Sequence, residues 1–182
     1  FTTGGIRGNK KSIGTFHPRS FNMGISKEVY KKTKGYKITR MGEDIEFSIR
    51  IMANGFKVGL IEKAFVYHKR RTNFRQFYKQ LHFFGRARIN VARFFMKELK
   101  LVHTFPAVFT LGVMVYLISY FIHPMLFITG SILLAIFVGL IFVDATLKNK
   151  SLLVGGLSVI AAFTQLLAYG IGFITEGLKR LF

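Results

Sequence analysis

The most informative stretch of the sequence is Gly42-Glu43-Asp44-Ile45-Glu46-Phe47-Ser48-Ile49-Arg50, an acidic cluster in a part of the chain that is otherwise basic. Apolar residues recur at i, i+4 and i+7, at Ile45, Ile49 and Met52, and Phe47 and Ile51 widen this apolar face, which predicts a short amphipathic helix. The pair Asn54-Gly55 is typical of a helix end. Glu43 and Asp44 would then lie in the first turn, where the helix macrodipole favours an ionised carboxylate. Such a group, partly exposed, can act as a base.

Further local patterns surround this helix. Ser26 is a good N-cap for a helix over residues 27–33, and Lys34-Gly35 is a typical end for it. Short apolar runs predict three strands, the last two paired across Glu62-Lys63; they are residues 21–25, 57–61 and 64–67.

Several short motifs between residues 21 and 68 accompany the acidic stretch. In chain order they are Phe21-Asn22-Met23-Gly24-Ile25-Ser26-Lys27-Glu28-Val29, Thr33-Lys34-Gly35-Tyr36, Gly42-Glu43-Asp44 with Phe47 and Arg50, Asn54-Gly55-Phe56, and Val66-Tyr67-His68. In order and spacing they resemble the acceptor-side half of a family 2 glycosyltransferase, the inverting type with a GT-A fold. From their spacing alone, Glu43 and Asp44 would be interpreted as residues that cap a helix. The resemblance favours a catalytic role for them instead.

The resemblance implies an α/β fold, a partial GT-A domain, and roles for five residues. In the family the Asp of the Glu-Asp pair is the catalytic base, which assigns that role to Asp44, with Glu43 supporting it. The family's Asn-Met segment lies under the donor sugar and the acceptor site, so Asn22 and Met23 are candidate substrate-binding residues. A histidine near the donor diphosphate and its cation corresponds to His68, the candidate metal ligand. Ordinary structural roles stay open for Asn22, Met23 and His68.

The resemblance also implies a cofactor that this sequence is poorly equipped to hold. The family binds a divalent cation, Mg²⁺ or Mn²⁺, through an Asp-x-Asp motif, and the sequence has no such motif. We therefore expect a fragment whose nucleotide-binding half, with the cation site, lies upstream of Phe1, and which is inactive alone. About 100 residues before the apolar part are too few for a whole domain of this type. An incomplete α/β layer with exposed apolar surface and an open sheet edge would follow.

Charge and hydropathy divide the chain into two regions of different composition. It has 182 residues, no cysteine, 51% hydrophobic residues and a formal net charge of +19. Residues 1–103 hold 23 basic against 6 acidic residues, whereas the remainder holds 4 against 2. The lack of cysteine excludes disulfides and cysteine-ligated zinc. A basic globular unit followed by a membrane region fits this asymmetry.

Residues 69–102 alternate basic clusters with aromatic and aliphatic residues at helical spacing. This predicts two amphipathic helices joined near Gly85-Arg86, lying in the membrane interface with their basic side chains among anionic headgroups. A basic helix packed on its own domain is the alternative. Where processive synthases of the family carry Q-x-x-R-W, this chain reads Gln80-Leu81-His82-Phe83-Phe84-Gly85-Arg86. Arg86 is thus a further candidate substrate-binding residue, and the departure argues against a processive polymerase.

Three apolar runs of 19, 20 and 23 residues follow, each long enough to cross a bilayer; they are residues 104–122, 124–143 and 152–174. His123-Pro124 would form a tight hairpin, and residues 144–151 a polar loop. The basic residues 1–103 predict a cytoplasmic location for the part before the first span. Three spans would then put Lys179 and Arg180 outside, against the same rule. Either the chain continues, or Gly170-Ile171-Gly172 bends the last helix back along the interface.

Together these observations predict three regions: residues 1–68 of a GT-A domain, interface helices over 69–103, and a membrane region of about three spans over 104–182. The implied function is a multi-pass inverting glycosyltransferase of the cytoplasmic (inner) membrane, its catalytic part facing the cytoplasm. It would move a sugar from a nucleotide-sugar donor to a lipid-linked or glycan acceptor, in cell-envelope polysaccharide or glycolipid synthesis. The alternative is a non-catalytic basic membrane anchor that recruits anionic lipid or an acidic partner. Nucleic acid is not an expected partner, because no recognised motif is present.

Overall fold

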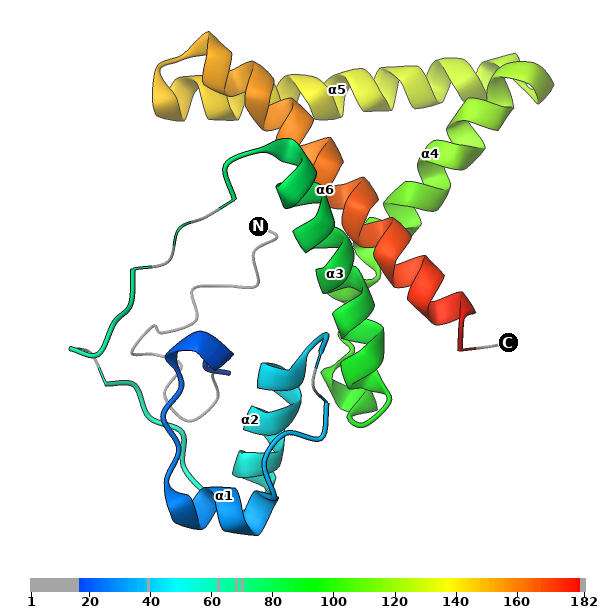
Figure 1. Ribbon diagram of the computed structural model, residues 1–182. Helices are drawn as coiled ribbons and strands as arrows, with labels where there is room; N and C mark the ends of the chain where they lie inside the picture. The colour runs from blue at the N-terminus through cyan, green and yellow to red at the C-terminus, as the bar shows by residue number, and fades with distance from the viewer. Residues whose placement is uncertain (1–16, 39, 62, 68, 70, 181–182) are drawn as a thin grey trace. The chain divides into compact units, whose positions relative to one another are not determined.

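The computed structural model describes residues 17–38, 40–61, 63–67, 69 and 71–180, and within these ranges every regular element is a helix (Figure 1). The α-helices are α1 (Lys27–Thr33), α2 (Glu43–Ala53), α3 (Phe74–Ala92), α4 (Phe105–Ile122), α5 (Pro124–Asn149) and α6 (Leu152–Leu178). Single 3₁₀ turns occur at η2 (Ser20–Asn22), η3 (Met96–Glu98) and η4 (Leu101–His103). The prediction of an α/β layer with an open sheet edge is therefore wrong for the described residues.

The three predicted strands are absent for a physical reason. Residues 20–22 form a 3₁₀ turn, and Ile61 and Ala64 close a tight turn in which the Ala64 N–H donates to the Ile61 carbonyl at 3.0 Å. The arms on either side of that turn form no hydrogen-bonded ladder in the described ranges. Tyr67 is 95% exposed. Alternating apolar residues make a strand only where a neighbouring strand satisfies their backbone groups.

The two short helices were predicted correctly. The Ser26 hydroxyl accepts a hydrogen bond from the Val29 N–H at 3.2 Å, and α1 ends on Lys34 and Gly35 with left-handed φ values of 57° and 71°. Helix α2 begins after Gly42 and ends at Asn54-Gly55. Its buried face includes three of the five residues predicted for it. Ile45, Phe47 and Ile51 are buried, whereas Ile49 and Met52 are only half-buried.

Contacts divide the chain into two units, each described by itself below. The first comprises Phe1–Arg70 with Asn90–Leu99, and the second Arg71–Ile89 with Lys100–Phe182. Helices α1 and α2 and the last turn of α3 thus belong to the first unit, while most of α3 and all of α4 to α6 belong to the second.

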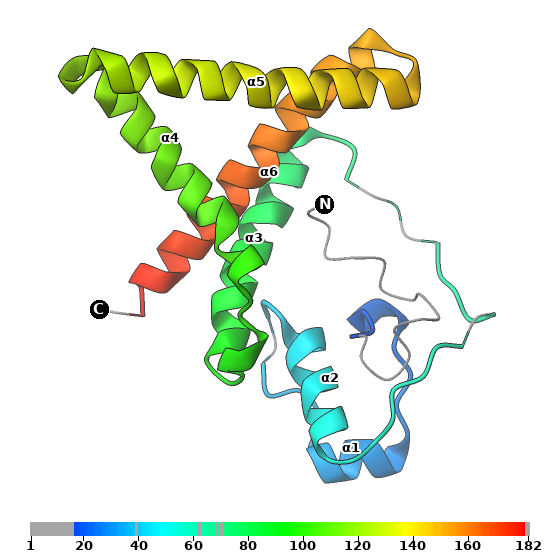
Figure 2. The same ribbon diagram turned by 180° about the vertical axis from the view of Figure 1, so that it is seen from behind.

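Helix α3 is one continuous helix, so the predicted break near Gly85-Arg86 is wrong. A Cβ added at Gly85 would meet the backbone carbonyl of Tyr169, and one added at Gly172 would meet that of His82. The backbones of α3 and α6 therefore touch where the two helices cross (Figures 1 and 2). Small residues permit such a contact, which is why a glycine lies in mid-helix here.

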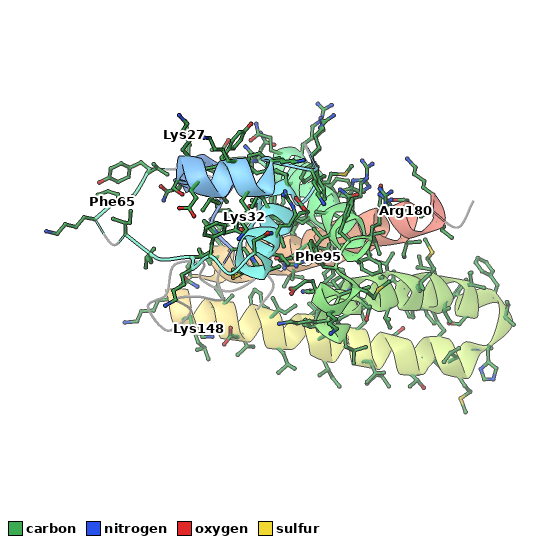
Figure 3. The ribbon with its side chains drawn as sticks, turned by 90° about the horizontal axis from the view of Figure 1, so that it is seen from below. Lys27, Lys32, Phe65, Phe95, Lys148 and Arg180 are labelled. Atoms are coloured by element: carbon green, nitrogen blue, oxygen red, sulfur yellow. The ribbon has the colours of Figure 1, made fainter. Side chains whose placement is uncertain are left out.

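Helices α4, α5 and α6 are each long and apolar enough to cross a membrane. Phe109, Phe137 and Phe163, one from each helix, meet with ring centroids 5.7 to 5.9 Å apart. The predicted hairpin at His123-Pro124 is present. The predicted polar loop is mostly helical, because α5 continues to Asn149 and Lys148 lies at its end (Figure 3).

Helix α6 passes through Gly170-Ile171-Gly172 without a break, so the proposed bend is wrong. A Cβ added at Gly170 would meet the Pro106 carbonyl oxygen and the Thr110 hydroxyl, both in the first turns of α4. Helix α6 therefore meets the first turns of α4 through Gly170, so we expect Lys179 to lie on the membrane side from which α4 starts.

Cysteine accessibility tests this arrangement cleanly, because the native chain has no cysteine. We expect Lys179→Cys to react with an impermeant thiol reagent only after cells are permeabilised, whereas His123→Cys, at the opposite end of α4, reacts in intact cells. Equal labelling of the two variants in intact cells would contradict the contact between Gly170 and the first turns of α4.

Candidate functional site

The loop that enters α2 has a constrained backbone. Met41 and Gly42 both have left-handed φ values, 61° and 98°. The buried Asn90 side chain donates to the carbonyls of Arg40 and Met41 at 3.3 and 3.0 Å. These bonds come from the last turn of α3 and hold an otherwise unfavourable conformation in place. The first turn of α2 is thereby positioned from two distant parts of the sequence.

The carboxylates of Glu43 and Asp44 lie in that first turn, and both residues are half-buried. The Asp44 Oδ1 atom accepts a hydrogen bond from the Ile45 N–H at 2.8 Å. The Glu43 Oε1 atom accepts one from the Ser20 hydroxyl at 3.5 Å. The Ser48 hydroxyl donates to the Asp44 backbone carbonyl at 2.5 Å. The Ile45 N–H at the helix N-terminus thus orients the Asp44 carboxylate, and a positioned carboxylate can act as a proton acceptor.

Tyr36 links these carboxylates to Met23. Its ring lies against Phe47, with centroids 4.6 Å apart, and its hydroxyl lies 3.9 Å from the Met23 sulfur. Burial raises the pKa of the Tyr36 hydroxyl, and the negative charges of Glu43 and then Asp44 raise it further. At neutral pH the hydroxyl therefore stays protonated and can donate a hydrogen bond beside the carboxylate pair.

A buried ion pair within α2 connects this helix to the turn after α1. Glu46 is fully buried and receives Arg50 in two-point contact, Nε to Oε1 at 2.6 Å and Nη2 to Oε2 at 3.1 Å. The same guanidinium donates to the carbonyls of Thr33 at 2.5 Å and Gly35 at 2.6 Å. Arg50 thus ties α2 to the turn that carries Tyr36. Such planar, multiply bonded contacts are the ones in which arginine is hard to replace.

Asn22 and Met23 line a pocket of about 330 Å³. Its other walls include Ser48 and Ile51 of α2 and residues 57–61. Glu43 and Asp44 do not line it. The structure therefore brings Met23 to the carboxylates through Tyr36, and places Asn22, which is exposed, on the adjoining pocket.

The other predicted site residues lie elsewhere. Arg86 belongs to the second unit, where its Nε donates to Glu176 at 2.9 Å. His68 lies outside the described residues. Among the residues that the structure does describe, no three His, Cys, Asp or Glu side chains form a group able to hold a metal ion. The described part of the chain thus does not fit a divalent-cation site.

Three functional features were not found from the sequence. The Glu46–Arg50 and Glu176–Arg180 pairs each have the i, i+4 spacing of helical ion pairs, so this signal was available. The position of Tyr36 beside Glu43 and Asp44 has no local signal, because it depends on how the turn after α1 meets α2.

Comparison with known proteins finds one family. The model described as "Glycosyl transferase family group 2" matches residues 20–143, which is more than half of the chain. No curated protein and no solved structure matches. The matched range contains η2, Tyr36, the start of α2, all of α3 and α4, and most of α5.

Proposed function

The chain belongs to glycosyl transferase family group 2, and on that premise we propose that it is a membrane-bound inverting glycosyltransferase. The donor is a nucleotide-sugar and the acceptor a hydroxyl on a lipid-linked or growing glycan. The setting is cell-envelope polysaccharide or glycolipid synthesis at the cytoplasmic membrane. Three apolar helices that could cross a bilayer support the membrane location.

One observation carries the proposal: an oriented carboxylate, Asp44, lies in the first turn of α2 inside the family match, with Tyr36 beside it. An ordinary helix cap would explain the carboxylate alone. It would not explain why the loop before this turn has a left-handed backbone at Met41, or why the protonated Tyr36 hydroxyl lies within electrostatic reach of Glu43 and Asp44.

In the proposed reaction Asp44 accepts the proton of the acceptor hydroxyl. As that oxygen attacks the anomeric carbon, the bond from this carbon to the nucleotide diphosphate breaks on the opposite face, so the configuration inverts. Glu43 supports Asp44 as its neighbour in the same helical turn. A positioned base of this kind contributes roughly 10²–10⁴-fold to the rate.

The proposed reaction includes a divalent cation, but the described residues do not form a site for it. The described residues do not fit its ligand set, so no step above is routed through it. Its ligands would come from other residues, with His68 as the candidate named from the sequence.

Transfer from nucleotide-sugars tests the proposal. Native membranes that contain the full-length protein are supplied with one radiolabelled nucleotide-sugar at a time, and lipid and glycan fractions are separated. We expect one donor to label a lipid or glycan fraction, with an inverted anomeric configuration in the product. Retained configuration, or release of free sugar from every donor without transfer, would contradict it.

A further inference from the structure

Tyr36 is an exposed aromatic residue beside the candidate base. It is 43% exposed, whereas Phe47, on which its ring packs with centroids 4.6 Å apart, is fully buried. The negative charges of Glu43 and Asp44 both act on its hydroxyl. An aromatic ring that is supported by the core and accessible to solvent therefore lies within electrostatic reach of both carboxylates.

Helix α2 holds Tyr36 in place through Arg50. This side chain donates to the Gly35 carbonyl at 2.6 Å and so fixes the peptide that precedes Tyr36. The same guanidinium lies 5.3 Å from the centre of the Phe47 ring, so it contacts both the turn and the ring that supports Tyr36. Because Tyr36 is already ordered, a ligand would not have to immobilise it, which favours binding.

The Tyr36 hydroxyl is available to a ligand as a donor. The hydrogen bond that it makes within the described residues goes to the Met23 sulfur, 3.9 Å away, and a thioether is a weak acceptor. Since the hydroxyl is protonated at neutral pH, it can donate to an oxygen of a bound molecule in place of this sulfur.

The arrangement suits a sugar ring better than other ligands. A pyranose has hydroxyl groups around its rim and C–H groups on its faces. The C–H groups pack on the negative face of an aromatic ring, and carboxylates accept hydrogen bonds from the hydroxyls. A phosphate group would be repelled by Glu43 and Asp44, and a lipid chain would leave both carboxylates without a hydrogen-bond partner in the ligand.

We propose that Tyr36 binds the terminal sugar of the acceptor, with its ring against one C–H face of that sugar and its hydroxyl bonded to a sugar oxygen. The acceptor is then a glycosylated molecule and not a lipid without sugar. The inference rests on the proposed function, because it makes this sugar the group whose hydroxyl gives its proton to Asp44.

Sugar binding in the absence of donor tests the inference. Saturation-transfer NMR is recorded on the full-length protein in a sugar-free detergent, and the probes are the methyl glycosides of glucose, galactose, mannose and N-acetylglucosamine. Sorbitol is the comparison, because it has similar hydroxyl groups but no ring. We expect at least one glycoside to bind, with the strongest transfer at the C–H protons of one face, and sorbitol not to bind.

Tyr36→Leu removes the ring and the hydroxyl and should weaken glycoside binding about tenfold, whereas Tyr36→Phe keeps the ring and should weaken it about threefold. Tyr67→Leu is the matched control, since it makes the same change at a tyrosine that is 95% exposed, and it should leave binding unchanged. Tryptic cleavage after Lys34 and Lys37 no faster than in the wild type shows that the turn of Tyr36→Leu is intact. If cleavage is faster, Tyr36→Phe decides, and binding equal to that of the wild type overturns the proposal.

Absence of glycoside binding, equal binding of sorbitol, or equal losses in Tyr36→Leu and Tyr67→Leu would also overturn the proposal. In transfer assays Tyr36→Leu should raise the KM for the acceptor about tenfold and keep kcat within about threefold, and an unchanged KM contradicts the inference. Glycoside binding is measured without donor, so its failure leaves the glycosyltransferase assignment standing. Failure of transfer likewise leaves the sugar-binding result standing.

Discussion

Asp44→Asn should abolish sugar transfer, with a loss of at least 100-fold in kcat, while donor affinity stays within about twofold of wild type. The amide preserves the size of the side chain and can still accept from the Ile45 N–H, but it cannot take the proton of the attacking hydroxyl. The measurement is transfer of labelled sugar by the full-length enzyme, together with equilibrium binding of the nucleotide-sugar.

Glu43→Gln is the matched control, since it makes the same chemical change one residue away. Glu43 bonds to Ser20 and adds only to the local potential, so we expect a loss of less than about tenfold. An Asp44→Asn enzyme that kept transfer within tenfold of wild type would remove Asp44 from the role of base. Equal losses in both variants would mean that the pair acts as a unit and not as one base.

Arg50→Met should lower the free energy of unfolding of the first unit by about 3–5 kcal/mol, because it leaves the fully buried Glu46 without its partner. It also removes the bonds to the carbonyls of Thr33 and Gly35. Tryptic cleavage after Lys34 and Lys37, in the turn that Arg50 holds, reports local opening. Pulse proteolysis of the full-length protein in increasing urea measures the change.

The double variant Glu46→Gln with Arg50→Met separates the ion pair from the fold around it. Removing both charges avoids a buried unpaired carboxylate, so this variant should be more stable than Arg50→Met alone. If Arg50→Met cost less than about 1 kcal/mol, the buried pair would not be what joins α1 to α2.

The position of the candidate base was predictable because its signals are local. Ser26, Lys34-Gly35, Gly42 and Asn54-Gly55 each act within one turn of the helix that they begin or end, and the structure has them there. The burial of Glu46 and the contact of Tyr36 with Phe47 were not predictable. Both arise where the turn after α1 packs on α2. No local sequence pattern in either segment indicates which residue of the other segment it will contact.

The glycines of the second unit also show which features local sequence patterns predict and which they do not. In sequence Gly85 reads as a break in an amphipathic pattern and Gly170-Ile171-Gly172 as a bend. In the structure all three glycines lie inside continuous helices, at points where another backbone or side chain comes too close for a Cβ. A local sequence pattern does not distinguish a glycine that ends a helix from a glycine that lets another backbone or side chain pack closely against the helix.

The sequence by itself determined α1 and α2 with their ends, the three apolar segments and the first helical turn that carries Glu43 and Asp44, because propensity, capping and hydropathy act over a few residues. Only the tertiary structure decided that the described residues of the 57–67 segment form no sheet, that α6 meets the first turns of α4 at Gly170, and that Arg86 is paired with Glu176. Each of these depends on a partner far away in the chain: a strand needs another strand, a helix end is placed by what it packs against, and a buried charge needs its counterion.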